Sequence, residues 1–215
     1  MLCRMVMLAA HARSALILVA AGAAAAPLAH AADQRGFEGR IQLRLMDAAP
    51  QGASYAVRGD RARIDVPGLP GVPTAHAIVD FARRTLITGT DATRRTARAS
   101  LPELGAASDA ATVHKTGKER LVVGQRCEEW TLLDGGHTVE ACVVPGVAWF
   151  DPRQLAGQEV PAWSRRLEAE RAFPVSVWEG DVTGRTVFAS WATDVARGPV
   201  GDEVFAAPRT ARRPH

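Results

Sequence analysis

The sequence predicts a mainly β protein: a curved antiparallel sheet or half-open barrel, with a helical insertion that covers the concave face. Short segments of alternating apolar and polar residues recur along the chain, and turn residues separate them about every eight to twelve residues. One segment, residues 152–172, instead carries apolar residues at helical spacing. This segment is the candidate cover of the sheet, and Pro161 can break it into two pieces.

The alternation is clearest in residues 37–45, where apolar residues and Gly39 occupy one face and charged or amide residues the other. This pattern is typical of a half-buried antiparallel strand. Further strands are expected at residues 55–57, 61–66, 75–80, 85–90, 93–99, 113–116, 120–123, 175–178 and 186–193. Their spacing favours one large sheet without an internal repeat.

The N-terminus has the layout of a secretory signal peptide over residues 1–31. Arg4 and Arg13 make a positive region, residues 15–26 form an uncharged apolar run, and Ala29-His30-Ala31 offers a site for signal peptidase. An apolar run of about a dozen residues is too short to span a membrane, which takes roughly 20. We therefore expect a periplasmic or secreted protein that is cleaved near Ala31 and does not span the membrane.

Residues 32–208 are expected to form one β-rich domain, and residues 209–215 a flexible basic tail. The chain has a net charge of +3, and two of its basic residues, Arg4 and Arg13, lie in the leader, so the domain is close to neutral. No run of Lys or Arg with interleaved aromatic residues marks a nucleic-acid surface. The sequence therefore predicts no nucleic-acid partner.

Two cysteines remain beyond the leader, Cys127 and Cys142, and an even number is typical of disulfides in an oxidising compartment. Between them lies Asp134-Gly135, a strong signal for a type I′ hairpin turn. With these two residues as the loop, Cys127 lies directly opposite Cys142, at a separation that a disulfide can bridge. We therefore predict a Cys127–Cys142 disulfide across the hairpin.

This register has one unfavourable consequence, because it makes Glu129 and Glu140 face each other as a like-charged pair. A three-residue loop at residues 134–136 is the alternative, and it offsets the two cysteines. The two-residue loop is the one that places Trp130, Leu132, Val139, Ala141 and Val143 on a single face of the hairpin.

The sequence carries no constellation of residues typical of an enzyme or a metal site. The histidines beyond the leader are scattered without metal-ligand spacing, at His76, His114, His137 and His215. There is no Gly-x-Ser-x-Gly motif and no phosphate-binding loop. Asp80 and Asp151 lie at the ends of expected elements, where turn or capping roles suit them. We therefore predict no catalytic residue, no metal and no cofactor.

Four stretches form an ordered set of motifs: VRGDRARID at 57–65, IVD at 78–80, GQRCEEWT at 124–131 and VEAC at 139–142. In this order they resemble the motifs of a family of secreted bacterial domains of unknown function. That family is similar to the LolA, LppX and RseB-like group, whose half-open antiparallel barrels cover a hydrophobic cavity with helices and bind acyl chains of lipids or lipoproteins. The resemblance spans about residues 37–205 and implies a LolA-like architecture.

If the helical segment covers the sheet only in part, inward-facing apolar side chains line a surface suited to an apolar ligand. The candidate lining residues are Phe37, Ile41, Leu43, Leu45, Trp130, Leu132, Val139 and Trp163. A filled core without a cavity is the alternative.

The sequence thus predicts a non-enzymatic periplasmic protein that binds a lipid, an acyl chain or another hydrophobic ligand. The alternative is an envelope protein-interaction or stress-sensing module without a stable small ligand, as in the RseB-like relatives. A secreted hydrolase is a third class, which no motif supports.

Overall fold

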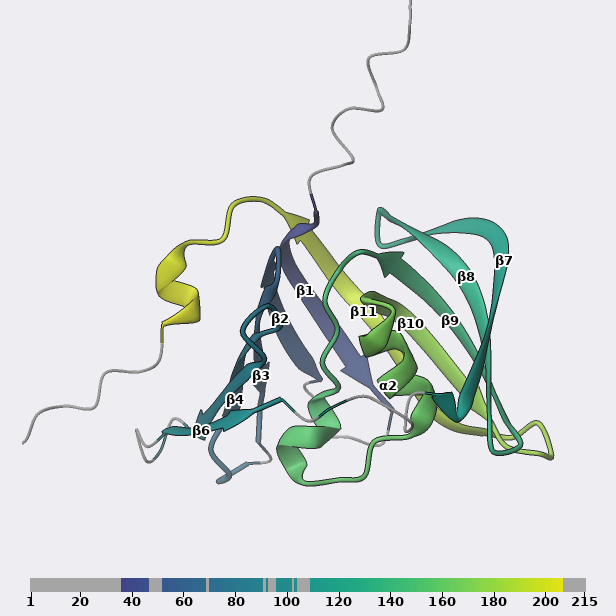
Figure 1. Ribbon diagram of the computed structural model, residues 1–215, viewed down its shortest axis with the longest axis horizontal. Helices are drawn as coiled ribbons and strands as arrows, with labels where there is room; N and C mark the ends of the chain where they lie inside the picture. The colour runs from purple at the N-terminus through teal and green to yellow at the C-terminus, as the bar shows by residue number, and fades with distance from the viewer. Residues whose placement is uncertain are drawn as a thin grey trace, which may run out of the picture. The chain divides into compact units, whose positions relative to one another are not determined.

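The described part of the chain forms one antiparallel sheet of eleven strands (Figure 1). The strands are β1 (Glu38–Leu45), β2 (Ala53–Arg58), β3 (Arg61–Val66), β4 (Ala75–Asp80), β5 (Thr85–Thr90), β6 (Thr96–Ser100), β7 (Ala111–Val122), β8 (Gln125–Asp134), β9 (His137–Pro145), β10 (Ala172–Gly180) and β11 (Thr186–Arg197). Their order across the sheet is β6-β5-β4-β3-β2-β1-β11-β10-β9-β8-β7. The predicted mainly β class is confirmed, and β6 and β7 are the two edges of an open sheet.

The computed structural model describes residues 36–46, 52–68, 70–90, 92, 96–101, 103 and 109–206. All of them belong to the unit formed by residues 35–215. The expected signal peptide and basic tail lie outside the described residues, so they stay predictions.

Strand β1 shows how the sequence pattern sets the two faces of the sheet. Ile41, Leu43 and Leu45 are buried, whereas the residues between them are exposed, as the period of two requires. The segments expected at 113–116 and 120–123 form a single strand, β7, whose pairing with β8 shifts between Lys115 and Glu119.

The chain between β9 and β10 covers the concave face of the sheet (Figure 1). The expected helix over residues 152–172 is corrected here to a 3₁₀ turn, η2 (Pro152–Ala156), and a helix, α2 (Ala162–Ala169). Gly157 ends the turn with a φ of 67°, a conformation that glycine adopts readily. Pro161 then stands extended as the residue before the first turn of α2, so the break falls at the proline as expected.

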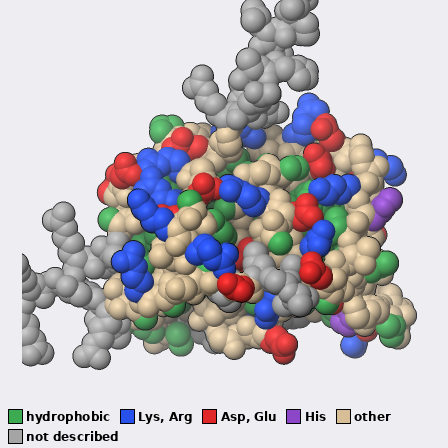
Figure 2. All heavy atoms as spheres, in the orientation of Figure 1, with side chains coloured by type: hydrophobic (Ala, Val, Ile, Leu, Met, Phe, Trp, Pro, Cys, Tyr) green, Lys and Arg blue, Asp and Glu red, His purple; other side chains and the backbone are tan. Residues whose placement is uncertain are grey.

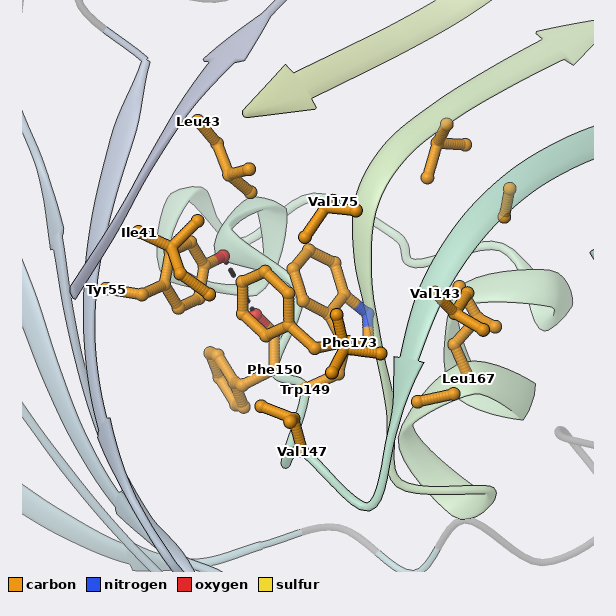
Figure 3. Packing of buried hydrophobic residues seen from close by; sticks show 14 of the residues in the cluster. Ile41, Leu43, Tyr55, Val143, Val147, Trp149, Phe150, Leu167, Phe173 and Val175 are labelled. Atoms are coloured by element: carbon orange, nitrogen blue, oxygen red, sulfur yellow. Dashed lines mark hydrogen bonds between the residues drawn. The ribbon is translucent and has the colours of Figure 1, made fainter. Parts of the chain in front are cut away.

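An aromatic cluster fills the space between the sheet and this cover (Figure 3). Tyr55 of β2, Trp149 of the cover and Phe173 of β10 contact one another with ring centroids 5.0 to 5.7 Å apart. The Tyr55 hydroxyl donates a hydrogen bond of 3.1 Å to the backbone oxygen of Phe150, which is itself fully buried. This contact satisfies the buried hydroxyl and joins the cover to the sheet.

The β8–β9 hairpin is present, but its register differs from the expected one by two residues. Asp134 pairs with His137, so Gly135 and Gly136 are the two loop residues. Both have positive φ, 57° and 92°, which a type I′ turn requires and which glycine adopts without strain.

This register removes the expected clash between Glu129 and Glu140. Glu129 lies opposite Cys142, and Glu140 lies opposite Thr131. Cys127 and Cys142 are therefore offset along the strands rather than directly opposed, yet their Cα atoms lie 5.4 Å apart. The predicted disulfide is present, and it fits an extracytoplasmic location.

We expect the double substitution Cys127→Ser/Cys142→Ser to lower the free energy of unfolding by about 3 kcal/mol, because the disulfide closes a loop of 15 residues in the unfolded chain. Chemical unfolding of the oxidised protein measures this difference. The reduced wild type serves as the control and should match the double variant. An unchanged unfolding midpoint in both would contradict the stabilising role.

Candidate functional site

A hollow of about 780 Å³ opens where the cover meets the end of the β8–β9 hairpin. We call it the rim hollow. Its lining consists of Asp134, Gly135, His137, Arg153, Glu159, Val160, Pro161, Ala162, Arg165 and Glu179. Charged side chains of both signs thus surround the space, which suits a polar occupant.

Glu179 is the central acid of the rim hollow. It lies on the inward side of β10 with only 8% of its surface exposed. One carboxylate oxygen lies 2.9 Å from Nδ1 of His137, and the other accepts a hydrogen bond of 3.0 Å from the indole of Trp163. The carboxylate therefore fixes the orientation of the imidazole, whose side chain is 40% exposed.

A carboxylate-oriented imidazole can accept a proton, as in general-base catalysis. The lining of the rim hollow, however, contains no Ser, Thr or Cys that His137 could activate as a nucleophile. What the arrangement offers most directly is a set of hydrogen-bonding and charged groups for binding.

Asp134 joins the hairpin to the cover helix. Its carboxylate accepts a hydrogen bond of 2.9 Å from the backbone N–H of Trp163, in the first turn of α2. Pro161, the residue in the capping position, makes no side-chain hydrogen bond there. Asp134, on a distant strand, therefore caps the N-terminus of α2 in place of a local capping residue.

Asp151 organises the other wall of the rim hollow. This buried carboxylate accepts hydrogen bonds from the guanidinium of Arg153 at 2.6 to 3.1 Å and from the Ser164 hydroxyl at 2.7 Å. Ser164 in turn accepts a hydrogen bond of 3.0 Å from the indole of Trp149. The network links η2, α2 and the aromatic cluster, and it points Arg153 along the wall of the hollow.

Arg153 is further held by two aromatic rings. Its guanidinium carbon lies 4.3 Å from the ring centre of Phe188 and 5.1 Å from that of Trp163. Such contacts stabilise a cation that has lost part of its hydration.

The predicted roles of two aspartates are confirmed. Asp151 accepts a hydrogen bond from the backbone N–H of Arg153 and caps η2. Asp80 accepts one of 2.8 Å from the backbone N–H of Arg83 in the turn after β4.

The apolar residues predicted to line a ligand cavity all lie buried in the main core. Their exposed fractions are low: Phe37, Ile41, Leu43, Leu45, Trp130, Leu132, Val139 and Trp163 all lie at or below 8%. Only Trp163 touches the rim hollow's polar network, through its hydrogen bond to Glu179. These side chains do lie in one core cluster, but Tyr55, Trp149 and Phe173 of the aromatic cluster are packed in the same core.

Sequence reasoning missed the pairing of His137 with Glu179. The two residues are 42 positions apart and meet because β9 and β10 are neighbours in the sheet. No local motif marks such a pair, and His137 on its own reads as one scattered histidine among several.

The described residues were also compared with what a metal site or a membrane span requires. No group of three or more His, Cys, Asp or Glu residues among them is placed to hold a metal ion. No helix in this part of the chain has the length and apolar character to cross a membrane. On the face shown in Figure 2, acidic and basic side chains are interspersed.

Glu168, on the cover helix, is a second buried acid. Only 7% of its surface is exposed, and burial raises the pKa of its carboxyl from 4.5 to about 7, against the opposing effect of a hydrogen bond with Gln154. It lines a hollow of about 270 Å³ that also includes Arg165.

We expect Arg153→Met to lower the free energy of unfolding by about 3–5 kcal/mol, because it leaves the buried Asp151 carboxylate without its cation. The matched control is Arg185→Met, which breaks a pair with Asp181 whose arginine is largely exposed and should cost far less stability. Urea unfolding measures both. Equal effects of the two substitutions would show that the Asp151 network does not hold the cover.

Glu168 makes stability depend on pH in a defined direction. The pKa of the Glu168 carboxyl is higher in the folded state than in the unfolded state. Its contribution to the free energy of unfolding is therefore complete below about pH 4.5 and is lost as the pH rises through about 7. Glu168→Gln removes this loss, so the variant should gain about 3 kcal/mol on the wild type between about pH 4.5 and 8. Unfolding curves across this range measure the gain, with Glu159→Gln as the control, and a constant difference would contradict the prediction.

Comparison with known proteins identifies no family. No family model matches the chain, and no curated protein matches it. Among solved structures it is similar to PNGF-II, with a TM-score of 0.46 and 8% identity over 79% of this chain and 30% of that one. It is also similar to MucB in the MucA/MucB complex of Pseudomonas aeruginosa (TM-score 0.35, 12% identity, 80% of this chain and 56% of that one) and to MucB alone (0.33, 12%, 80% and 57%).

The chain thus spans just over half the length of the MucB chains and under a third of the PNGF-II chain.

Proposed function

We propose that this protein is a non-enzymatic binding module of the extracytoplasmic space that docks a segment of a partner protein at the rim hollow. One observation carries the proposal: aromatic side chains occupy the space between sheet and cover, while the rim hollow is open and charged. The disulfide supports the compartment, because such bonds persist in oxidising environments.

A carrier of a lipid or another hydrophobic ligand, the first expectation from the sequence, is less well supported. A ligand on the concave face would have to displace Trp149, Phe150 and Phe173, which are buried against Tyr55. It would also have to loosen the cover, which the Asp151 network and the bond between Asp134 and Trp163 hold in place. Displacing well-packed aromatic side chains costs several kcal/mol each.

A polypeptide suits the rim hollow better than a small ion does. Glu159 is exposed and negatively charged. Arg153 and Arg165 add positive charge around the same space, and His137 adds a hydrogen-bonding imidazole. Complementary charges of both signs fix the register of a bound segment and disfavour wrong partners. This supports the protein-interaction alternative among the two functions that the sequence favours.

Two measurements on protein exported to a bacterial periplasm test the proposal. Native mass spectrometry with organic extraction should find the mass of the chain without bound lipid. A discrete mass excess that extracts as lipid would contradict the proposal and favour the carrier.

A photo-crosslinking residue at Glu159, in the rim hollow, should then give a discrete protein adduct in the periplasm. The matched control places it at Leu121, which is 71% exposed at the opposite end of the β7–β8 pair and should give none. Equal adducts at both positions, or none at Glu159, would overturn docking at the rim hollow.

A further inference from the structure

A second hollow, of about 440 Å³, lies over β8 and β9 on the face of the sheet opposite the aromatic cluster. We call it the convex hollow. Its lining consists of Thr116, Arg120, Glu129, Trp130, Thr131, Glu140, Ala141 and Trp178. Strand alternation places Thr131 and Glu140 on this face, because their neighbours Leu132 and Val139 are buried in the core.

Trp178 forms an aromatic wall of the convex hollow. It is 47% exposed, which is unusual for a residue of this size and apolar character. Its ring stacks on that of Trp191 with the centroids 6.0 Å apart and the planes within 3° of parallel. Trp178 is on β10, between β11, which carries Trp191, and β9, over which the hollow lies. Trp191 therefore packs on one face of the Trp178 ring, and the other face adjoins the hollow.

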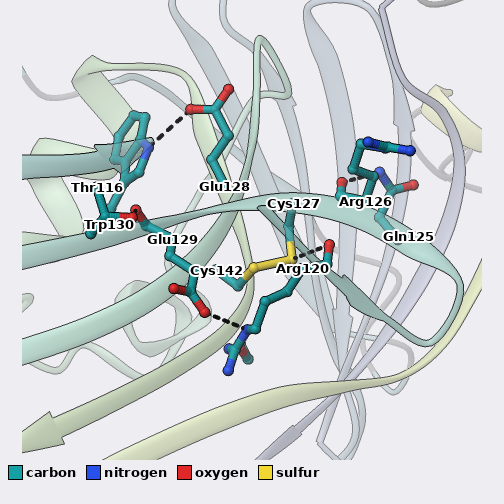
Figure 4. The surroundings of a disulfide bond; sticks show 10 residues. Thr116, Arg120, Gln125, Arg126, Cys127, Glu128, Glu129, Trp130 and Cys142 are labelled. Carbon is teal, nitrogen blue, oxygen red and sulfur yellow. Dashed lines mark hydrogen bonds and ion pairs between the residues drawn. A yellow bond between two sulfur atoms is a disulfide. The ribbon is translucent and has the colours of Figure 1, made fainter. Parts of the chain in front are cut away.

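Polar groups stand opposite this wall. Glu140 pairs directly with Trp178 across β9 and β10, and among the described residues its carboxylate has no ion-pair partner. Arg120 and Glu129 form an ion pair of 3.0 Å beside the disulfide (Figure 4). The hydroxyl of Thr116 is fixed by its hydrogen bond of 2.8 Å to the backbone oxygen of Glu129.

The chemistry of this lining excludes several ligand classes. Beside Trp178 and the buried Trp130 and Ala141, a lipid would meet five charged or hydroxyl-bearing side chains, which would lose their hydration without compensation. An anion would find a single guanidinium, Arg120, already paired with Glu129, and a free carboxylate on Glu140. A flat aromatic face beside a carboxylate, an ion pair and hydroxyls instead matches a neutral polyhydroxylated ring, whose C–H face packs on the indole while its hydroxyl groups bond the polar side.

We propose that the convex hollow is a saccharide-binding site that seats one neutral pyranose ring of a glycan against Trp178. Glu140 and the Arg120–Glu129 pair receive its hydroxyl groups, and Trp191 holds the indole upright. The disulfide between β8 and β9 holds the two strands beneath the hollow together, since Cys142 lies opposite Glu129 in the hairpin. The site shares no lining residue with the rim hollow, so it does not depend on docking there.

Isothermal titration with cellotriose, maltotriose and triacetylchitotriose tests the proposal on the purified protein. We expect saturable binding of at least one trisaccharide, unchanged at high salt because the ligand is neutral. Trp178→Ala should weaken it at least about tenfold, which corresponds to about 1.4 kcal/mol. Glu140→Ala, at an exposed position that leaves the aromatic stack intact, should also weaken it.

Leu133→Ala is the matched control, because Leu133 is exposed on the same face of β8 but does not line the convex hollow. It should bind as tightly as the wild type. Absence of saturable binding for all three trisaccharides, or equal affinity of the wild type and Trp178→Ala, overturns the proposal. So does salt-sensitive binding of tetralysine that Trp178→Ala abolishes while no trisaccharide binds, because that result assigns the hollow to a cationic peptide.

Discussion

The buried ion pair between Asp151 and Arg153 is the interaction on which the arrangement of this domain depends. An open curved sheet exposes its apolar concave face unless a separate segment covers it, and here that segment has only short helical turns to offer. Helices of this length are marginal on their own in water, so contacts with the rest of the domain have to hold them in place. The Asp151 carboxylate accepts hydrogen bonds from Arg153 and Ser164, and Ser164 accepts one from the indole of Trp149. This hydrogen-bond network fixes the position of the cover, in addition to its apolar contacts.

A cover held in this way changes where binding can occur. Once Trp149 and Phe150 lie inside, the concave face is a core, and its apolar side chains serve stability. The groups that stay accessible outside this core include the acids, arginines and histidine at the rim, and Trp178 on the opposite face. Because function does not follow from fold, the curved sheet by itself assigns no ligand to this domain.

The sequence predicted what depends on neighbours along the chain. Alternation located most strands, Asp134-Gly135 marked the hairpin, and Pro161 marked the break in the cover. The sequence could not predict the exact register of the hairpin, because each of the residues Asp134 to Gly136 is suited to the turn. In the structure Asp134 pairs with His137 at the end of the strand, and its carboxylate accepts a hydrogen bond from the first turn of α2. Nor could it predict contacts such as His137 with Glu179, which exist only after β9 and β10 pair.

The pairing of β9 with β10 connects the two candidate sites. Trp178 and Glu179 are adjacent in sequence, so the period of two sends one to the convex hollow and the other to the rim hollow. A slip of one residue would exchange them, placing a carboxylate beside Trp191 and an indole beside His137 and Trp163. The register shift between Pro174 and Ser176 occurs where a proline has no N–H to donate, a position at which an extra residue can be accommodated. The same irregularity that lets β10 follow the curved sheet therefore also determines which of its side chains each site receives.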